Sequence, residues 1–542
     1  MSADTQAARR LAEAEAEAAP LGTALGPRRP GPTGVCSSAH NVTAWLEDLA
    51  RRSGWMDRRA YLDDGRPWSY EELHAAIASS ATLLAERGAR PERPVLVATH
   101  DRIAFVLAFL GAARLGAVPV PVNPRLTAHD YAFMTADARP TLVVCEDELV
   151  PHFPGLSVLT ASELEARGPR QPATPAAALP ENALLYGQYT SGTTGTPKLV
   201  LHRHSDVAHH AEVIRTILEP TPDDVFFSVS RAYFSYGLGN SVLCVLSTGV
   251  GAVLQRALPT VAAVSEVMAR ARPTVLFAVP TFYAVLVTEG EASPFRSLRA
   301  CLSAGEALAP AIQEHAAGFL GATILNGLGS TEVGHLFVAN TLRDCTPGTF
   351  GRAMPGYTLG VRDERRELVA PGEMGTLWVQ GPTLMVGYHN RPEESERILA
   401  GDWLCTGDRV IVDGDGLVHH HGRSDDLEMV GGISVAPMEI EAVLAGHPAV
   451  EDVAVVALPD GIGASRLRAF AVLAPSQAPS EDLERSLLQL VRDHLVAYMV
   501  PRSVTFVAAL PRTPSGKLQR HVLRRGWPQP GSPSPAGADG QP

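Results

Sequence analysis

A short loop dense in hydroxyl groups and glycines gives the strongest chemical signal in this sequence. The loop spans residues Tyr189 to Lys198 and reads YTSGTTGTPK. Its hydroxyl and backbone N–H groups can donate to phosphate oxygens, its glycines let the backbone approach an anion closely, and its lysine supplies positive charge. Because the lysine has the wrong spacing for a GxxxxGK[ST] loop, the pattern disfavours a generic P-loop kinase. The candidate phosphate-binding residues are Thr190, Ser191, Gly192, Thr193, Thr194, Gly195 and Lys198.

Four further motifs follow this loop, and each combines a glycine with a charged side chain. They are GSTE at residues 329–332, WLCTGD at 403–408, GRSDD at 422–426 and PRTPSGK at 511–517. In this order the five motifs resemble those of the acyl- and aryl-adenylate-forming enzymes, a family that includes acyl-CoA ligases, adenylation domains and beetle luciferases. The resemblance covers roughly residues 40–525. The sequence departs from the family at Leu199, where most members have Gly, and at Leu328, where most have an aromatic residue.

The resemblance implies catalytic roles for Lys517, Thr331 and Glu332. The family's corresponding lysine reaches from the small domain and bridges the carboxylate and the α-phosphate. The attack of one anion on another needs such an ammonium at the developing pentavalent phosphorus. Glu332 is a hard oxygen ligand suited to Mg²⁺ on the ATP phosphates, and Thr331 can donate to the α-phosphate.

The resemblance also implies how the rest of the nucleotide is bound. Asp408 matches the family's ribose-binding carboxylate, and Arg423 is expected near the ribose or the phosphates. The segment Ser303–Ala307, with Gly305 and Glu306 at its centre, resembles the loop whose backbone lines the adenine. The expected nucleotide is therefore ATP, which leaves as AMP.

A second half-reaction is implied by the same family pattern. The small domain would rotate about Asp425, withdraw the catalytic lysine and present Gly432 beside a tunnel for the thiol of CoA. A glycine suits that position because a Cβ there would narrow the approach to the pantetheine arm. Met429, where many relatives have Lys or Asn, is a departure close to this face.

Two segments indicate which acid is activated. FSYGLGN at residues 234–240 and NGLGSTEVGH at 326–335 resemble the benzoate-CoA ligase branch of the family, in which a leucine at position 328 is usual. Carried over by position, the acid-binding residues are Ser235, Tyr236, Gly329 and His335. Without these motifs, Tyr236 and His335 would be interpreted as ordinary half-buried aromatic side chains. The hydroxyl of Ser235 could accept a ring substituent or bond to the backbone, and the sequence leaves both possibilities open.

Three functions remain compatible with these residues. The first is an aryl-acid CoA ligase, and the second is an enzyme that loads the aryl group onto the phosphopantetheine of an acyl carrier protein. The third is a non-catalytic protein of the same fold. That third function predicts losses among the catalytic and nucleotide-binding positions, and the sequence has none.

The spacing of apolar residues predicts the elements that hold these motifs. Short apolar strands alternate with helices, which is typical of an α/β fold with largely parallel sheets. The predicted strands are Pro94–Thr99, Ala117–Val122, Thr141–Cys145, Thr274–Val279, Leu298–Leu302 and Ala322–Leu325. Asp101 is expected to cap a helix at Ile103–Leu115, and a second predicted helix lies near Ala128–Ala136.

A change of pattern after about residue 375 predicts a second domain. Beyond residue 425 we expect helices at Met438–Leu444 and Glu481–Leu495, with strands at Val450–Leu458, Leu467–Leu473 and Val504–Val507. The predicted organisation is a disordered segment at residues 1–35, a large adenylate-forming domain at 36–423, a small mobile α+β domain at 424–527 and a disordered tail at 528–542.

Composition excludes several classes of protein. Against 58 Asp and Glu, the 542 residues include 46 Lys and Arg, so the net charge of −12 gives no overall attraction for nucleic acid or an anionic membrane. No run approaches the roughly 18 apolar residues of a membrane helix. The six cysteines are scattered without a CxxC pair, which predicts free thiols rather than disulfides or a zinc site. We expect a cytoplasmic protein that is a monomer or a homodimer.

Overall fold

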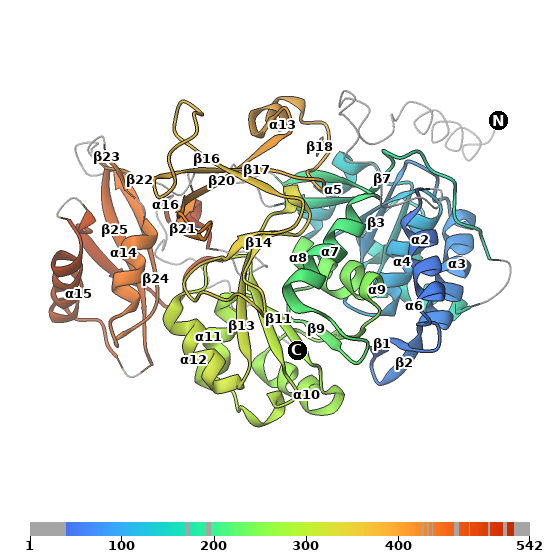
Figure 1. The fold of residues 1–542 in the computed structure, drawn as a ribbon, viewed down its shortest axis with the longest axis horizontal. Helices are drawn as coiled ribbons and strands as arrows, with labels where there is room; N and C mark the ends of the chain where they lie inside the picture. Colours follow the sequence, from blue (N-terminus) through green and yellow to red (C-terminus); the bar gives the residue numbers. More distant parts are fainter. Residues whose placement is uncertain are drawn as a thin grey trace. The chain divides into compact units, whose positions relative to one another are not determined.

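The chain divides into two units. The computed structural model describes residues 40–169, 173–190, 197–423, 428–430, 433–435, 437–459, 465–475, 477–496, 499–512 and 518–524. Contacts group Met1–Leu359 with Val379–Leu404 as the first unit, and Gly360–Trp378 with Cys405–Pro542 as the second (Figure 1). The predicted disordered ends and the predicted hinge residue Asp425 lie outside the described residues, so a domain boundary at residue 423 stays a prediction.

A nine-stranded sheet forms the centre of the first unit. Its strand order is β15-β14-β13-β12-β11-β9-β10-β1-β2, and the six strands from β13 to β1 pair in parallel. The antiparallel strands β2, β14 and β15 lie at its two edges. The bounds are β1 Arg59–Asp63, β2 Arg66–Ser69, β9 Val225–Ser228, β10 Gly251–Leu254, β11 Val275–Ala278, β12 Ala300–Ala304, β13 Thr323–Gly329, β14 Leu336–Ala339 and β15 Arg352–Ala353.

Two smaller sheets contain the other strands of this unit that position the candidate site. A parallel sheet of order β4-β3-β5-β6 contains β3 Pro94–Ala98, β4 Val118–Pro121, β5 Leu142–Cys145 and β6 Val158–Thr160. An antiparallel sheet of order β18-β8-β7 contains β7 Leu184–Thr190, β8 Lys198–Arg203 and β18 Gly387–Tyr388. The expectation of an α/β fold with largely parallel sheets is confirmed.

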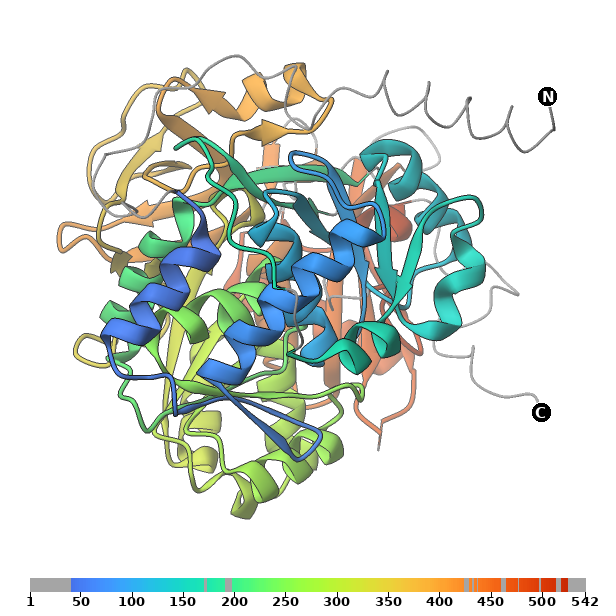
Figure 2. The same cartoon turned by 90° about the vertical axis from the view of Figure 1, so that its right-hand side faces the viewer.

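Helices cover the sheets and fill the chain between strands. The α-helices are α2 Val42–Arg52, α3 Tyr70–Glu86, α4 Ile103–Arg114, α5 Ala128–Ala138, α6 Ala161–Arg167, α7 Asp206–Leu218, α8 Ser235–Leu238, α9 Cys244–Thr248, α10 Val261–Ala271, α11 Pro280–Glu289, α12 Pro310–Leu320 and α13 Pro392–Ile398. Figures 1 and 2 show α3 and α4, both blue, lying side by side. They approach closely because Gly111 in α4 has no side chain, and a Cβ there would lie 2.9 Å from Leu84 Cδ1.

The expected cap of helix α4 is wrong. Its N-cap residue is Arg102, and Asp101 instead accepts the backbone N–H of Ala232 at 3.1 and 3.2 Å. The first N–H groups of the helix, which have no partner within the helix, donate to side chains from other elements. Ile103 N–H donates to Asp63 at 3.0 Å, and Ala104 N–H donates to Glu165. Periodicity located the helix, but the capping partners come from distant parts of the sequence.

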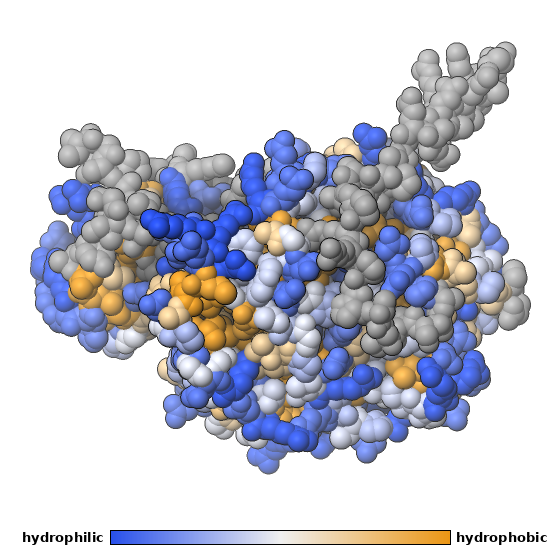
Figure 3. Space-filling model, turned by 45° about the horizontal axis from the view of Figure 1, so that its top comes forward, coloured by the Kyte–Doolittle hydropathy of each residue, from blue (hydrophilic) through white to orange (hydrophobic). Residues whose placement is uncertain are grey.

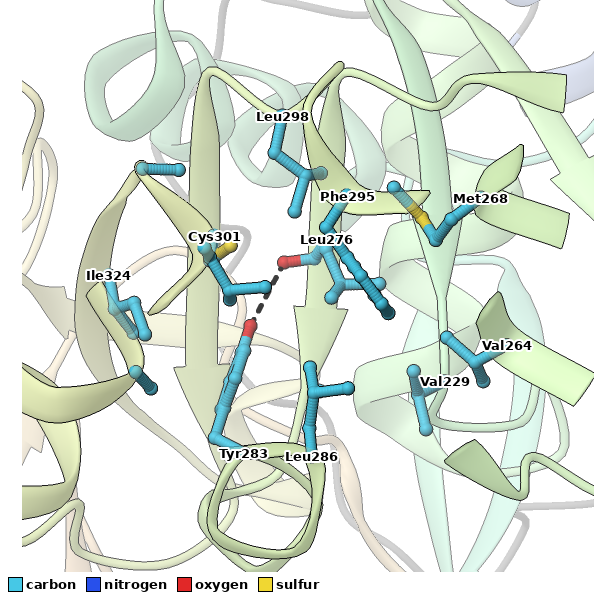
Figure 4. Close-up of a cluster of buried hydrophobic side chains, with 14 of the residues drawn as sticks. Val229, Val264, Met268, Leu276, Tyr283, Leu286, Phe295, Leu298, Cys301 and Ile324 are labelled. Carbon is cyan, nitrogen blue, oxygen red and sulfur yellow. Dashed lines mark hydrogen bonds between the residues drawn. The ribbon is translucent and has the colours of Figure 1, made fainter. Parts of the chain in front are cut away.

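One hydrophobic core of the first unit lies between the large sheet and the helices α10 to α12. Figure 4 shows Leu276 of β11 and Cys301 of β12 surrounded by apolar side chains, among them Leu286 and Phe295. The one polar group of Tyr283 that enters this core is satisfied, since its hydroxyl donates to the Leu276 carbonyl at 3.2 Å. The core therefore holds β11 and β12 in fixed register beneath the loops that follow them.

The second unit has its own core and its own sheet. Strands β24 Val450–Pro459, β25 Ser465–Leu473 and β26 Ser503–Phe506 form a three-stranded sheet packed with α14 Pro437–Ala445 and α15 Glu481–His494. The short elements β22 Glu428–Val430, β23 Ile433–Val435 and α16 Arg520–Arg524 complete it. A further sheet, of which β19 falls within the residues of the first unit, contains β16 Thr358–Arg362, β17 Met374–Gln380, β19 Leu399–Ala400, β20 Trp403–Val412 and β21 Val418–Arg423. The predicted smaller α+β domain is confirmed.

The surface of the described residues is mainly polar. Blue hydrophilic residues predominate over orange hydrophobic ones on the face drawn in Figure 3. The large hydrophobic side chains exposed in the described chain are Val150, Leu258, Val285, Leu368, Met374 and Val496. Among the described helices, not one combines the length and the apolar character that a membrane crossing requires. The five described cysteines are free thiols, and Cys36 lies outside the described residues.

A single buried carboxylate joins the starts of three parallel strands. Asp224, which precedes β9, accepts the hydroxyl of Thr274 at 2.7 Å and two N–H groups of Arg299 at 2.7 and 2.8 Å. Thr274 and Arg299 directly precede β11 and β12. Burial alone would raise the pKa of Asp224, but the hydrogen bonds from Arg299, the Thr221 N–H and Thr274 outweigh it and hold that pKa below its ordinary value.

We expect Asp224→Asn to lower the free energy of unfolding by about 2–3 kcal/mol at pH 7, the value of hydrogen bonds to a charged group. Because the folded-state pKa is depressed, the stabilisation exists above the unfolded pKa and disappears as the pH falls through the folded value. Urea unfolding followed by circular dichroism at pH 7 and at a series of pH values below about 3.9, the ordinary pKa of Asp, measures both effects.

The neighbouring Asp223 provides the control, because its side chain is 98% exposed and pairs with Arg58 at 3.3 Å. Asp223→Asn should change stability by less than about 0.5 kcal/mol. Equal unfolding midpoints for the two variants at pH 7 would contradict the structural role of Asp224.

Candidate active site

The two ends of the phosphate loop are brought together by a β-hairpin. Strands β7 and β8 pair antiparallel, and Thr190 lies opposite Lys198 across them. Five of the predicted phosphate-binding residues, Ser191, Gly192, Thr193, Thr194 and Gly195, lie outside the described residues. The structure therefore fixes the anchor points of the loop, which are the last residue of β7 and the first residue of β8.

The unusual Leu199 is part of the hydrophobic core at the exit of this loop. Its side chain is fully buried with Leu201 between β8 and the four-stranded parallel sheet. Gly187 on the paired strand makes room for it, since a Cβ there would lie 2.9 Å from Leu199 Cδ1. The sequence departure is thus matched by a glycine on the neighbouring strand.

Lys198 and Glu332 are linked through a tyrosine that the sequence motifs did not identify. Lys198 Nζ lies 2.5 Å from Glu394 Oε2 and 5.1 Å from the centre of the Tyr388 ring. The hydroxyl of Tyr388 donates to Glu332 Oε1 at 2.7 Å. Tyr388 therefore contacts the Lys198 ammonium with its ring and the Glu332 carboxylate with its hydroxyl. The signal for Tyr388 is its place in β18, which pairs with β8 opposite Val200.

Thr331 and Glu332 lie in a tight turn whose backbone carbonyls accept hydrogen bonds from other segments. The turn is the 3₁₀ segment Thr331–Val333, which follows β13. The Glu332 carbonyl accepts the backbone N–H of Met385 at 2.8 Å, and the Val333 carbonyl accepts the hydroxyl of Thr383 at 2.7 Å. These bonds fix the direction in which the Glu332 carboxylate is presented.

The predicted acid-binding residues meet in the same unit. The ring of Tyr236 stacks on that of His335 with centroids 6.0 Å apart and planes 24° apart. His335 Nε2 donates to Asn240 Oδ1 at 3.1 Å, and the Tyr236 hydroxyl donates to the Leu302 carbonyl at 2.8 Å. Burial lowers the pKa of His335 to about 4, so its imidazole is neutral near pH 7. Two flat, uncharged rings suit an aromatic acid better than a charged or flexible one.

Ser235 joins the acid-binding residues to the phosphate-handling turn. Its Oγ lies 3.2 Å from the hydroxyl of Thr331, a residue 96 positions later in the sequence. This contact, to a side-chain hydroxyl, is neither of the two possibilities left open by the sequence. This contact places the first residue of helix α8 beside the turn that ends β13.

Glycines allow the close packing around His335. A Cβ at Gly329 would lie 2.6 Å from the His335 carbonyl oxygen, and a Cβ at Gly239 would lie 2.2 Å from His335 Cδ2. Gly239 begins a short π-helical segment, Gly239–Leu243, between α8 and α9. A π-helical turn is uncommon and is often found at functional sites.

The predicted adenine loop follows β12. Gly305 has a φ of +95°, which a residue with a side chain rarely adopts, and Glu306 beside it is half-buried. Strand β12 pairs in parallel with β13, so this loop and the Thr331 turn leave the same edge of the sheet.

In the second unit, two predicted nucleotide residues lie side by side. Asp408 of β20 is opposite Arg423 of β21, with Arg423 Nη1 at 3.5 Å from Asp408 Oδ1. His420, which the motifs did not identify, has its Nε2 3.2 Å from the same oxygen. Burial alone would raise the pKa of Asp408, but the bond to His420 and the charge of Arg423 outweigh it and hold that pKa below its ordinary value. The carboxylate is therefore ionised and able to accept two ribose hydroxyl groups.

Three predicted residues cannot be placed. Lys517, Gly432 and Asp425 lie outside the described residues. Their roles in catalysis, thiol approach and domain rotation stay predictions from the resemblance. In the described chain no three or more His, Cys, Asp or Glu side chains cluster in a way that would hold a metal ion.

Comparison with known proteins gives a consistent set of relatives. The family model described as AMP-binding enzyme matches residues 47–389, and the model of the AMP-binding enzyme C-terminal domain matches residues 439–517. The p-hydroxybenzoic acid–AMP ligase FadD22 of Mycobacterium tuberculosis is 37% identical over 90% of this chain and 69% of its own length. The benzoate–CoA ligase of Thauera aromatica is 37% identical over 88% of this chain and 93% of its own length.

Solved structures agree with these relatives. The anthranilate CoA ligase AuaEII in complex with anthranoyl-AMP has a TM-score of 0.82 and 30% identity, covering 89% of this chain and 96% of its own. A benzoate CoA ligase from Burkholderia xenovorans LB400 has a TM-score of 0.81 and 35% identity, covering 89% and 99%.

The contact between Gly239 and His335 gives a prediction. We expect Gly239→Ala to displace the His335 ring, break its bond to Asn240 and lower the free energy of unfolding by about 1–3 kcal/mol, the usual cost of overpacking. Thermal melting measures the change. Gly318→Ala in α12 is the control, since a Cβ there would meet nothing within 4 Å. A melting temperature for Gly239→Ala at or above that of Gly318→Ala would contradict the prediction.

Proposed function

The chain belongs to the family of AMP-binding enzymes, and we propose that it activates a benzoate-like aryl carboxylic acid with ATP and transfers the aryl group to CoA. It is an AMP-forming acid–thiol ligase of the benzoate–CoA ligase type. The observation that carries the proposal is the 3.2 Å contact between Ser235 and Thr331, because it joins the aromatic acid-binding residues to the turn that handles phosphate.

In the first half-reaction an oxygen of the aryl carboxylate attacks the α-phosphorus of ATP, and the bond to pyrophosphate breaks. Thr331 donates its hydroxyl to the α-phosphate, Lys198 and the hydroxyl groups of its loop hold the phosphates, and Lys517 neutralises the developing charge. Asp408 and Arg423 bind the ribose side, and the loop with Gly305 and Glu306 binds adenine. In the second half-reaction the CoA thiol attacks the carbonyl carbon of aryl-AMP and AMP leaves.

Glu332 is the residue that would hold Mg²⁺ on the ATP phosphates. The fit is chemical, since a carboxylate oxygen is a hard ligand of the kind that Mg²⁺ prefers. The bond from the Tyr388 hydroxyl orients this carboxylate through Oε1. When bound, Mg²⁺ would neutralise part of the phosphate charge and so favour the approach of the acid.

The proposed acid-binding residues favour an uncharged aromatic ring. Burial lowers the pKa of His335 to about 4, so this side chain carries no charge near pH 7. Tyr236 uses its hydroxyl to bind the Leu302 carbonyl and therefore presents a ring face rather than a free phenol. This arrangement supports benzoate and simply substituted benzoates as substrates.

The alternative acceptor is the phosphopantetheine of an acyl carrier protein. It has specific support, because relatives of similar identity include both a p-hydroxybenzoic acid–AMP ligase and benzoate–CoA ligases. Transfer from preformed aryl-AMP to free CoA, measured beside transfer to a holo carrier protein, separates the two. Preference for the carrier protein would replace CoA as the proposed acceptor and leave the adenylation step unchanged.

We expect acid-dependent exchange of pyrophosphate into ATP with benzoate and hydroxy- or aminobenzoates, and little exchange with short fatty acids. The physical reason is the stacked, uncharged pair of Tyr236 and His335. A panel that also includes cinnamate and heteroaryl acids measures the selectivity. Failure of every aryl acid to support exchange would refute the proposed substrate class.

Lys517→Ala should reduce acid-dependent pyrophosphate exchange by about 10²–10³-fold, because it removes the charge that stabilises the transition state. Transfer of the aryl group from preformed aryl-AMP should be affected much less. Lys198 and Lys517 are the two lysines of a sequence whose other basic side chains are arginines, so no neighbouring ammonium replaces the lost one. Gln519→Ala, two residues further on, is the control. Equal loss in exchange and in transfer would overturn the assigned role of Lys517.

A further inference from the structure

A buried histidine outside every motif holds the Thr331 turn. His202 lies in β8, four residues after Lys198, and is completely buried. Its Nε2 is 2.7 Å from the backbone carbonyl oxygen of Thr331, 129 residues away in the sequence. Its Nδ1 is 3.0 Å from Asp206 Oδ2, and Asp206 is itself only 1% exposed.

The partners of this ring determine where its protons lie. A carbonyl oxygen can only accept a hydrogen bond, so His202 Nε2 carries a proton and donates it to Thr331. Asp206 Oδ2 also accepts the backbone N–H of Arg203 at 3.1 Å. The Thr331 carbonyl oxygen, which cannot donate, is what requires the proton on Nε2, and Asp206 holds the ring through Nδ1.

The turn packs directly against the same imidazole. Gly334, which follows the turn, has a φ of +84°, and a Cβ there would lie 3.2 Å from His202 Cε1 and 3.0 Å from His210 Nε2. The His202 ring also stacks on Tyr186, with centroids 5.0 Å apart. The imidazole therefore packs against a residue of the paired strand β7 and lies close to the turn.

His202 completes the support of the turn. The carbonyls of Glu332 and Val333 are bound by Met385 and Thr383. The carbonyl of Thr331 accepts the Gly334 N–H at 3.1 Å within the turn and also accepts from His202. Strand β8 thus carries both Lys198 at its start and the histidine that fixes Thr331.

We infer that His202, with Asp206, is a positioning residue for the activation of the acid. It sets the direction of the Thr331 hydroxyl and the Glu332 carboxylate relative to Lys198, without contacting the substrate. The inference rests on the proposed function, because it assigns to Thr331 and Glu332 the handling of the ATP phosphates. A displacement of about 1 Å in such a group can cost on the order of 10²-fold in rate.

A pair of variants of equal length isolates the hydrogen bond to Thr331. His202→Gln keeps an N–H donor close to the position of Nε2, whereas His202→Met has a similar shape and no donor. Both are made together with Asp206→Asn, so that neither variant leaves a buried carboxylate without its imidazole. His204→Asn is the control, because His204 is equally buried but its Nδ1 accepts the Val42 N–H at 3.1 Å, far from the turn in sequence.

The expected result is a loss in kcat without a matching change in KM. His202→Met should lower kcat for pyrophosphate exchange by about 10²-fold relative to His202→Gln, while KM for ATP and for the acid changes less than about threefold. His204→Asn should retain the wild-type kcat. Equal kcat values for the Gln and Met variants, or a change confined to KM, would overturn the inference.

Amide hydrogen exchange provides a readout that does not depend on activity or on the identity of the acid. The peptide containing Thr331–Gly334 should exchange faster in the Met variant than in the Gln variant, with the rest of the first unit unchanged. Equal protection of that peptide in the two variants would overturn the inference. A wild-type enzyme without aryl-acid-dependent exchange would instead contradict the proposed function, so the two failures are distinguishable.

Discussion

The Thr331–Val333 turn depends on hydrogen bonds to its three backbone carbonyls, and much of the described site depends on that turn. Each carbonyl is bound by a different donor: His202 in β8, the backbone N–H of Met385, and the hydroxyl of Thr383. A short 3₁₀ segment has little stability of its own, so these external bonds decide its conformation. Because the turn is fixed, Thr331 can meet Ser235 and Glu332 can meet Tyr388 at hydrogen-bonding distance.

The large parallel sheet positions this turn, and the two ends of its strands have different roles. At the starts of the strands, Asp224 connects β9, β11 and β12 through bonds to Thr274 and Arg299. At the carboxyl ends, β9, β12 and the neighbouring β13 lead into the segments that carry Ser235, Gly305 and Thr331. A buried carboxylate fixes the starts of the strands. The loops at the carboxyl ends carry the residues proposed to bind the substrates.

The chain has a net charge of −12, and the described basic side chains proposed to bind ATP are paired with nearby carboxylates. In the first unit Lys198 is paired with Glu394 and lies over Tyr388, and in the second unit Arg423 is beside Asp408. Lys198 and Arg423, the two described cations that are proposed to meet ATP, therefore each have a carboxylate partner within the protein. Such partners hold the basic side chains in place without giving the surface a basic field.

The sequence by itself determined the fold class, the positions of the central strands and helices that it predicted, and the residue types of every motif, because periodicity and turn chemistry are local properties of the chain. It did not reveal Asp101 bound to Ala232, Tyr388 bound to Glu332, His420 bound to Asp408, or His202 bound to Thr331. Three of those partners are separated by 131, 56 and 129 positions, and only the pair His420–Asp408 is close in sequence. A hydrogen bond needs its atoms within about 3 Å. Only the packed tertiary structure brings such distant residues to that distance, so it alone decided which side chains support the motifs that the sequence had already displayed.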